Sequence, residues 1–162
     1  MTKLSTKKHF KKIQKKYPTS DYAIASNYYL GLIEMQDLPK SEKAREKQIK
    51  KALGYYETYI EKSPDGRFAS NCAEEILKLN TTLKNYDYLI IAKVYYENGE
   101  YDKAKKLLEK TTLAESWPEF VKTEFKLKNY EKTKEMYPFV KYNETVEIMS
   151  LSDYKKLSKI MV

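Results

Sequence analysis

The side chains that could take part in catalysis are few and are not grouped at catalytic spacings. Glu74 and Glu75 are adjacent carboxylates that could be imagined as an acid and base pair. On a helix, however, neighbouring side chains point about 100° apart, so we interpret this pair as part of a solvated face. The chain has one cysteine, Cys72, and one histidine, His9. We therefore expect neither an internal disulfide nor a zinc site built on cysteines.

Motifs for nucleotide binding, metal binding and hydrolysis are missing from the sequence. The four glycines are far apart and form no phosphate-binding loop, and no His-Glu-x-x-His, Cys-x-x-Cys or Gly-x-Ser-x-Gly motif occurs. Cys72 lies on an apolar stripe and is interpreted as a small core residue. The sequence therefore predicts a protein that is not an enzyme and has no cofactor and no bound metal. A less favoured alternative is the helical accessory domain of a cell-wall enzyme.

The formal net charge of +8 is concentrated near the start of the chain. Residues 1 to 16 hold seven lysines and no acid, whereas the rest of the chain has almost equal numbers of bases and acids. A second, weaker basic segment covers residues 39 to 51. Because the body is nearly neutral, it does not have the broad basic surface that follows a phosphate backbone. Nucleic acid is therefore not expected as the main partner.

The first basic segment, KKHFKKIQKKYP at residues 7 to 18, has two interpretations. On a helical wheel Phe10, Ile13 and Tyr17 share one face, which we expect to pack on the next helix. The lysines spread over the opposite half, as the solvated outer face of a repeat helix. The alternative is a polyanion binder, for nucleic acid or an anionic membrane surface. The predicted basic patch consists of Lys7, Lys8, Lys11, Lys12, Lys15 and Lys16.

Helical periodicity covers nearly the whole chain, and short breaks with Pro, Gly or capping residues divide it. The predicted fold class is all-α, with a short helix after Ser150 or Ser152 following helices near 4 to 17, 20 to 36, 41 to 62, 66 to 82, 85 to 98, 100 to 112, 115 to 127 and 129 to 137. No apolar run reaches the length of a membrane span. The compartment depends on the start: cytoplasmic if Met1 is native, and periplasm or cell envelope if a signal was removed.

One segment, AKVYYENGEYDKAKKLLEK at residues 92 to 110, resembles a tetratricopeptide repeat. Ala92 and Ala104 are small enough for two helices to cross closely, Gly99 makes the turn, and Tyr101 fills the space between the helices. A degraded copy follows at residues 117 to 138, with Trp117 at the early aromatic position and Tyr130 standing 29 residues after Tyr101. In this copy Lys128 replaces the turn glycine and Thr133 replaces the alanine, and Pro138 is expected to end the second helix.

Upstream segments fit the same repeat. YYLGL at residues 28 to 32 matches the Leu-Gly of a first helix through Gly31, and KALGYYETYIEKSP at residues 51 to 64 matches a second helix through Ala52, Tyr56 and Pro64. Phe10, Ile13 and Pro18 have the spacing of Tyr56, Tyr59 and Pro64, so residues 7 to 18 are predicted to be a second helix whose first helix is missing or was removed. The chain is therefore predicted to be one domain over residues 1–162, a right-handed superhelix with units near 4–36, 37–82, 85–112 and 115–137 and a tail at 138–162.

The order of these pieces resembles the outer-membrane assembly lipoprotein family, the tetratricopeptide subunit of the bacterial β-barrel assembly machinery. The resemblance covers about residues 7 to 112 and is strongest in RFASNCAEEIL and YDYLIIAKVYYENGEYDKA. It implies a scaffold or adaptor within an envelope assembly complex. No signal with a lipidated cysteine is seen in this sequence, so we expect membrane contact only through a lipid anchor not present in it or through weak electrostatics. Periplasmic adaptors and cell-wall lytic enzymes share the same helical pattern.

Tetratricopeptide arrays bind peptides or partner proteins on the concave surface of their first helices, and the resemblance supplies the site hypothesis. Aromatic residues flanked by lysines suit the anchoring of a peptide side chain or carboxylate. The alternative is that several of these residues belong to the core between repeats. The predicted partner-binding residues are Tyr28, Leu32, Met35, Tyr86, Leu89, Lys93, Tyr96, Lys122 and Phe125.

Overall fold

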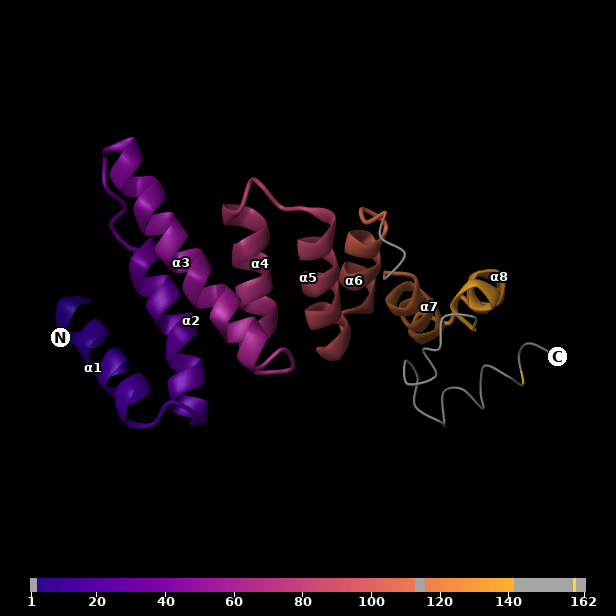
Figure 1. The fold of residues 1–162 in the computed structure, drawn as a ribbon, viewed down its shortest axis with the longest axis horizontal. Coiled ribbons are helices and arrows are strands. Elements are labelled where there is room, and N and C mark those ends of the chain that lie inside the picture. The colour runs from indigo at the N-terminus through magenta and orange to yellow at the C-terminus, as the bar shows by residue number, and fades with distance from the viewer. Residues whose placement is uncertain (1–2, 113–115, 142–158, 160–162) are drawn as a thin grey trace. The chain divides into compact units, whose positions relative to one another are not determined.

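Helices are the regular secondary structure of the described part of the chain. A computed structural model describes residues 3–112, 116–141 and 159, and eight helices and no strand lie within them (Figure 1). The predicted fold class, an all-α tetratricopeptide-like fold, is confirmed. The helices are α1 (Lys3–Lys16), α2 (Asp21–Met35), α3 (Glu42–Lys62), α4 (Ala69–Leu79), α5 (Asn85–Glu97), α6 (Tyr101–Leu108), α7 (Trp117–Lys126) and α8 (Tyr130–Lys141).

The chain forms two compact units, Met1–Leu83 and Lys84–Val162. In the first unit α2 packs against α1 and α3, and α3 packs against α4. In the second unit α5 packs against α6, α6 against α7 and α7 against α8. Sequential helices joined by short links are the expected neighbours in such an array. No helix in the described residues is long and apolar enough to span a bilayer.

The core of the first unit depends on a glycine that faces a tyrosine. A Cβ atom built on Gly31 would lie 2.3 Å from Cε1, 2.6 Å from Cζ and 2.8 Å from Cδ1 of Tyr56. Tyr56 is fully buried in α3, so its ring has no open side to move into. The Leu-Gly pattern in α2 is thus required by the close approach of α3.

Aromatic rings connect the first three helices with the start of α4. Phe10 of α1 stacks on Tyr29 of α2 with centroids 5.5 Å apart, and Tyr28 stacks on Phe68 at 4.5 Å. Phe10 therefore packs as predicted. Tyr17 does not, because it lies just after the last residue of α1 and is 53% exposed. The prediction that Tyr17 anchors this helix is wrong.

The turns after α5 and α7 share one backbone geometry. Gly99 has φ +74° and Lys128 has φ +62°. In each turn the left-handed residue donates its N–H to the carbonyl three residues earlier, at 3.0 Å, and the next N–H reaches the carbonyl five residues earlier. This double hydrogen bond is the Schellman motif. Lys128 thus occupies the position of Gly99, 29 residues later, as the repeat alignment predicts.

Some predicted helix boundaries need correction. Pro138 lies inside α8, which continues to Lys141. A proline removes one backbone hydrogen bond and can bend a helix without ending it. Helices α4 and α6 are shorter than predicted at both ends. The short helix expected after Ser150 or Ser152, and the tail beyond Lys141 except residue 159, fall outside the described residues.

Candidate functional site

Three of the predicted partner-binding residues lie together in the second unit, on α5 and α7. Lys93 and Tyr96 come from α5, and Lys122 comes from α7. The Lys122 ammonium lies 5.1 Å from the centroid of the Tyr96 ring, which is a cation–π contact. Glu119 of α7 joins both lysines, with its carboxylate 2.9 Å from the Lys122 ammonium and 3.8 Å from that of Lys93. We call these four residues the α5/α7 cluster.

The α5/α7 cluster has two cations, one anion and an aromatic ring. The side chains of Lys122 and Glu119 are each only 14% exposed, so this pair is largely shielded and fixed in place. The side chain of Lys93 is half exposed and its contact with Glu119 is long. Because exposed pairs of this kind contribute little, Lys93 can exchange Glu119 for a ligand at small cost. The cluster therefore presents one available ammonium beside a buried ion pair.

The exposed face of α5 is turned slightly from the predicted one. Tyr86 is 64% exposed and lies two turns before Lys93, so the two residues share a face. Leu89 is buried, and Ile90 is the exposed residue between them. The inclusion of Leu89 in the binding surface is therefore wrong, since its side chain belongs to the core between α5 and its neighbours.

Phe125 is also unavailable at the surface. It is buried in α7, and its ring lies 5.9 Å from that of Tyr130 in α8. It therefore joins the two helices of its own repeat, and the expectation of an exposed aromatic there is wrong. Trp117, predicted as a structural residue, is instead partly exposed at the start of α7.

The predicted residues of the first unit form a separate group on α2. Tyr28 stacks on Phe68, and burial is the main cause that raises the pKa of its hydroxyl. Leu32 and Met35 are half-buried further along the helix. None of these three predicted residues is charged. Their role in binding stays a prediction.

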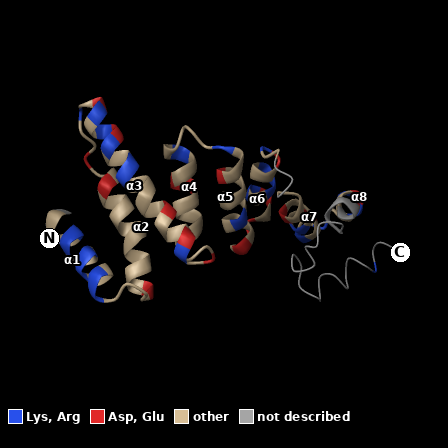
Figure 2. Ribbon diagram, in the orientation of Figure 1, with Lys and Arg blue, Asp and Glu red and all other residues tan. Residues whose placement is uncertain are grey.

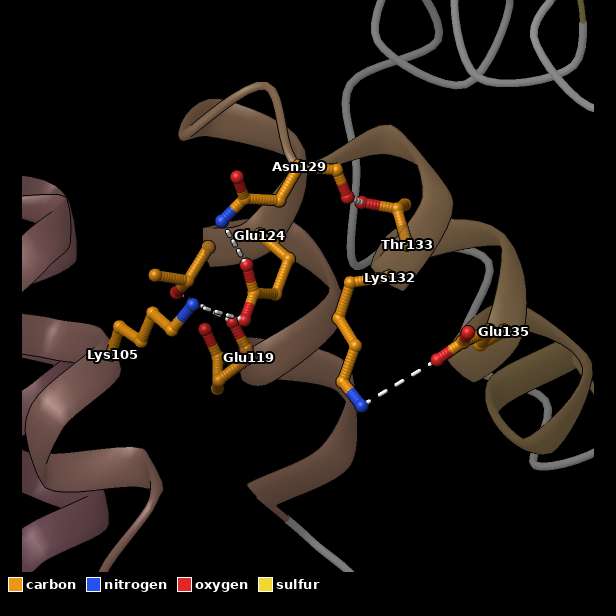
Figure 3. Close-up of polar contacts among 8 residues, drawn as sticks. Lys105, Glu119, Glu124, Asn129, Lys132, Thr133 and Glu135 are labelled. Atoms are coloured by element: carbon orange, nitrogen blue, oxygen red, sulfur yellow. Dashed lines mark hydrogen bonds and ion pairs between the residues drawn. The ribbon is translucent and has the colours of Figure 1, made fainter.

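A buried acid that the sequence analysis missed holds α6 to α7. Glu124 is almost fully buried, and its carboxylate lies 2.8 Å from the Lys105 ammonium of α6 and accepts a hydrogen bond from the Asn129 side chain (Figure 3). The hydrogen bond to Glu124 raises the pKa of Lys105. Glu124 lies three residues after Val121, which is buried on the same helix. That spacing is the signal that could have identified it.

The basic patch on α1 is only partly as predicted. Figure 2 shows that α1 carries blue residues and no red ones along its length. Lys8, Lys11, Lys12, Lys15 and Lys16 are exposed. Lys7, in contrast, forms an ion pair with Glu34, whose side chain is buried in α2. The placement of Lys7 on the outer face is therefore wrong, because it neutralises a buried acid.

The described residues contain no group of His, Cys, Asp and Glu side chains that could hold a metal ion. Cys72 is fully buried, and burial raises the pKa of its thiol to about 12. A thiol in that state is a poor nucleophile at neutral pH. Cys72 is therefore a packing residue, beside Ala69 and Ala73.

Five of the residues predicted to form the repeat are buried. Gly31, Ala52, Tyr56, Ala92 and Ala104 are all buried at helix contacts, as their types require. Tyr101 contacts the ring of Tyr96 at 5.3 Å and so connects α6 to the α5/α7 cluster. Pro64 lies directly after the end of α3. Of these residues, Ala92, Tyr101 and Ala104 belong to the second unit, where they pack α5 and α6.

Comparison with protein families gives one match. Residues 88–112, which include most of α5 and all of α6, match the tetratricopeptide repeat family. No curated protein matches the sequence. The match covers the same segment that the sequence pattern predicts and contains Lys93 and Tyr96. Residues 88–112 of this chain are therefore similar to a tetratricopeptide repeat.

Proposed function

We propose that this protein is a non-enzymatic scaffold that binds a peptide segment of another protein on the α5/α7 face of its second unit. Tetratricopeptide repeats generally mediate protein–protein interaction. The observation that carries the proposal is the α5/α7 cluster, in which first helices of consecutive repeats bring an available lysine beside a fixed ion pair and an aromatic ring.

The chemistry of this face indicates the kind of ligand. Tyr86 and Ile90 expose aromatic and apolar surface in the first half of α5, and Trp117 exposes aromatic surface at the start of α7. Aromatic anchors with a lysine at their side are typical of protein recognition surfaces. The Lys93 ammonium can form a charge-assisted hydrogen bond with a carboxylate or a backbone carbonyl. The preferred ligand is therefore an extended peptide with an apolar side chain next to an acidic one.

The finer part of the proposal is a role in bacterial outer-membrane protein assembly or cell-envelope maintenance. Its support is the resemblance of residues 7 to 112 to the outer-membrane assembly lipoprotein family, through the order of the pieces YYLGL, KALGYYETYIEKSP and YDYLIIAKVYYENGEYDKA. The coarser scaffold function does not depend on this role. A scaffold without the envelope role would still bind peptides on the same face.

Peptide selection tests the scaffold function. Peptides are selected from a displayed random library on the immobilised full chain, and their affinities are measured by fluorescence polarisation. We expect the Y86A/K93A variant to bind the selected peptides about tenfold more weakly, the loss typical of truncating two interface anchors. The matched control is Y22A/K106A, which removes the same residue types at exposed positions elsewhere.

Unchanged binding by Y86A/K93A, or an equal loss in both double variants, contradicts the assignment of this face. All the substituted side chains are exposed, so circular dichroism should show native helix content in each variant. A selection that yields no peptide at all contradicts the scaffold function itself.

A further inference from the structure

We propose that the first unit carries a separate docking surface for an acidic peptide segment, formed by two lysine-lined grooves that meet at Lys51. The inference deepens the proposed scaffold function and rests on it, because it assigns a second partner-binding surface and names its chemistry. The surface joins the two basic segments of the sequence, residues 7 to 16 and 39 to 51, which come from α1 and α3.

The first groove is lined by residues of α1, α2 and α3. Its volume is about 370 Å³, and its lining includes three lysines, Lys7, Lys11 and Lys51, against one acid, Glu34. The Lys7 ammonium is committed to the buried Glu34 carboxylate. Within the described residues the side chains of Lys11 and Lys51 take part in no ion pair or hydrogen bond. Two uncompensated positive charges therefore line this groove.

The second groove lies between α3 and the end of α4 and has a volume of about 870 Å³. Four lysines, Lys51 among them, line it with a single acid, Glu46, and all four are exposed. Apolar side chains also take part in the lining, namely Ile49, Leu53 and Leu79. The other lysines are Lys43, Lys47 and Lys50. Since Lys51 lines both grooves, an extended ligand can pass from one to the other across α3.

The ion pair between Lys7 and Glu34 has a counterpart in the second unit, between Lys105 and Glu124. Lys105 follows Ala104 by one residue, and Lys7 follows Thr6, the residue of α1 that aligns with Ala104, by one residue. Their partners also match. Glu34 lies three residues after Gly31, and Glu124 lies three residues after Val121, which stands 29 residues after Ala92. The same ion pair thus occurs in both units.

The two matching grooves differ in charge. The groove beside Lys105 and Glu124 has a volume of about 560 Å³ and is lined by equal numbers of lysines and glutamates, three of each. The groove beside Lys7 and Glu34 has an excess of two lysines. The ion pair holds the helices together in both units, so the additional lysines in the first unit are not needed for that purpose. They are the feature that selects an anionic ligand.

The shape and lining favour an acidic peptide over other polyanions. The lysines line two connected grooves, a shape that an extended chain follows more closely than a flat membrane surface does. A nucleic acid is held by lysines that follow its phosphates and needs no aliphatic pocket. Ile49, Leu53 and Leu79 instead provide apolar contacts for side chains placed between acidic residues. A peptide in which acidic and aliphatic residues alternate meets both requirements.

The test uses the full chain and a labelled dodecapeptide of alternating Glu and Leu. We expect K11E/K51E to weaken binding at least about tenfold at physiological salt, because both uncompensated charges of the first groove are reversed. The matched control, K8E/K12E, makes the same charge change on exposed lysines of α1 that line neither groove. A peptide with Gln in place of Glu should bind neither the parent chain nor the variants.

Several outcomes would overturn the inference. Equal losses in K11E/K51E and K8E/K12E would mean that only net charge matters. No loss in K11E/K51E would mean that the peptide binds elsewhere. Tighter binding of a short DNA duplex, or of phosphatidylserine vesicles, that K11E/K51E abolishes would assign the grooves to another anion. If any of these results occurs while Y86A/K93A still weakens the library-selected peptides, this inference fails and the proposed function stands.

Discussion

Replacing Gly31 by alanine should destabilise the first unit, although alanine is the better helix former. Removing a glycine from the interior of a helix normally gains about 1 kcal/mol. Here the new methyl group would lie 2.3 to 2.8 Å from three ring atoms of Tyr56. Forcing extra atoms into a packed core costs about 1–3 kcal/mol, and the ring is fully buried, so the upper part of that range applies. We expect a net loss of about 2 kcal/mol in the free energy of unfolding.

The same substitution at Gly54 provides the control. Gly54 lies in α3 of the same unit, and a Cβ atom there would meet nothing within 4 Å. G54A should therefore gain about 0.5–1 kcal/mol from helix propensity alone. Urea unfolding followed by circular dichroism measures both variants against the parent chain, with linear extrapolation to water.

Opposite signs for the two alanine variants are the expected result. If G31A is as stable as the parent or more stable, then α2 and α3 do not approach as closely as the contact between Gly31 and Tyr56 requires. A second check is the double variant G31A/Y56L, in which the smaller side chain leaves room for the methyl group. Its loss should be smaller than the sum of the two single losses.

Three other properties follow from single residues. Lys128 has a left-handed backbone that glycine adopts without strain, so K128G should raise the free energy of unfolding by about 1 kcal/mol in urea, whereas G99A should lower it by a similar amount. The Tyr56 hydroxyl is buried and has no hydrogen-bond partner among the described residues, so Y56F should keep or raise the thermal midpoint, and a clear fall would contradict this. Burial raises the pKa of the Cys72 thiol to about 12, above the value of about 8.5 in an unfolded chain. Above about pH 8.5 the thiol ionises in the unfolded chain but not in the folded one. The free energy of unfolding should therefore fall as the pH rises from about 8.5. At pH 8 a thiol reagent should therefore modify the native protein far more slowly than the urea-unfolded chain.

The sequence was sufficient for the fold class because its signals are local. Helical periodicity, the proline and glycine breaks and the spacing of small and aromatic residues predict the helices and the repeat. Even the degraded turn at Lys128 could be predicted, because its alignment with Gly99 requires the same backbone. Pro138 was misjudged because a proline weakens a helix without always ending it.

The candidate site was harder to predict because it depends on the rotation of each helix. Leu89 and Phe125 were expected at the surface, but a small difference in rotation moves each of them into the core. Glu119 was missed because a surface acid on one helix gives no sign that two lysines will meet it. Lys7 was placed in solvent because its partner Glu34 is distant in the sequence.

The most direct test of the account is to map the bound peptide on the full chain. An isotope-labelled sample is titrated with a library-selected peptide, and backbone amide shifts are recorded by NMR. We expect the largest changes in α5 and α7, around Tyr86, Lys93 and Lys122, and about tenfold more peptide should be needed to produce them in Y86A/K93A. Changes confined to other helices, with α5 and α7 unaffected at saturation, would contradict it.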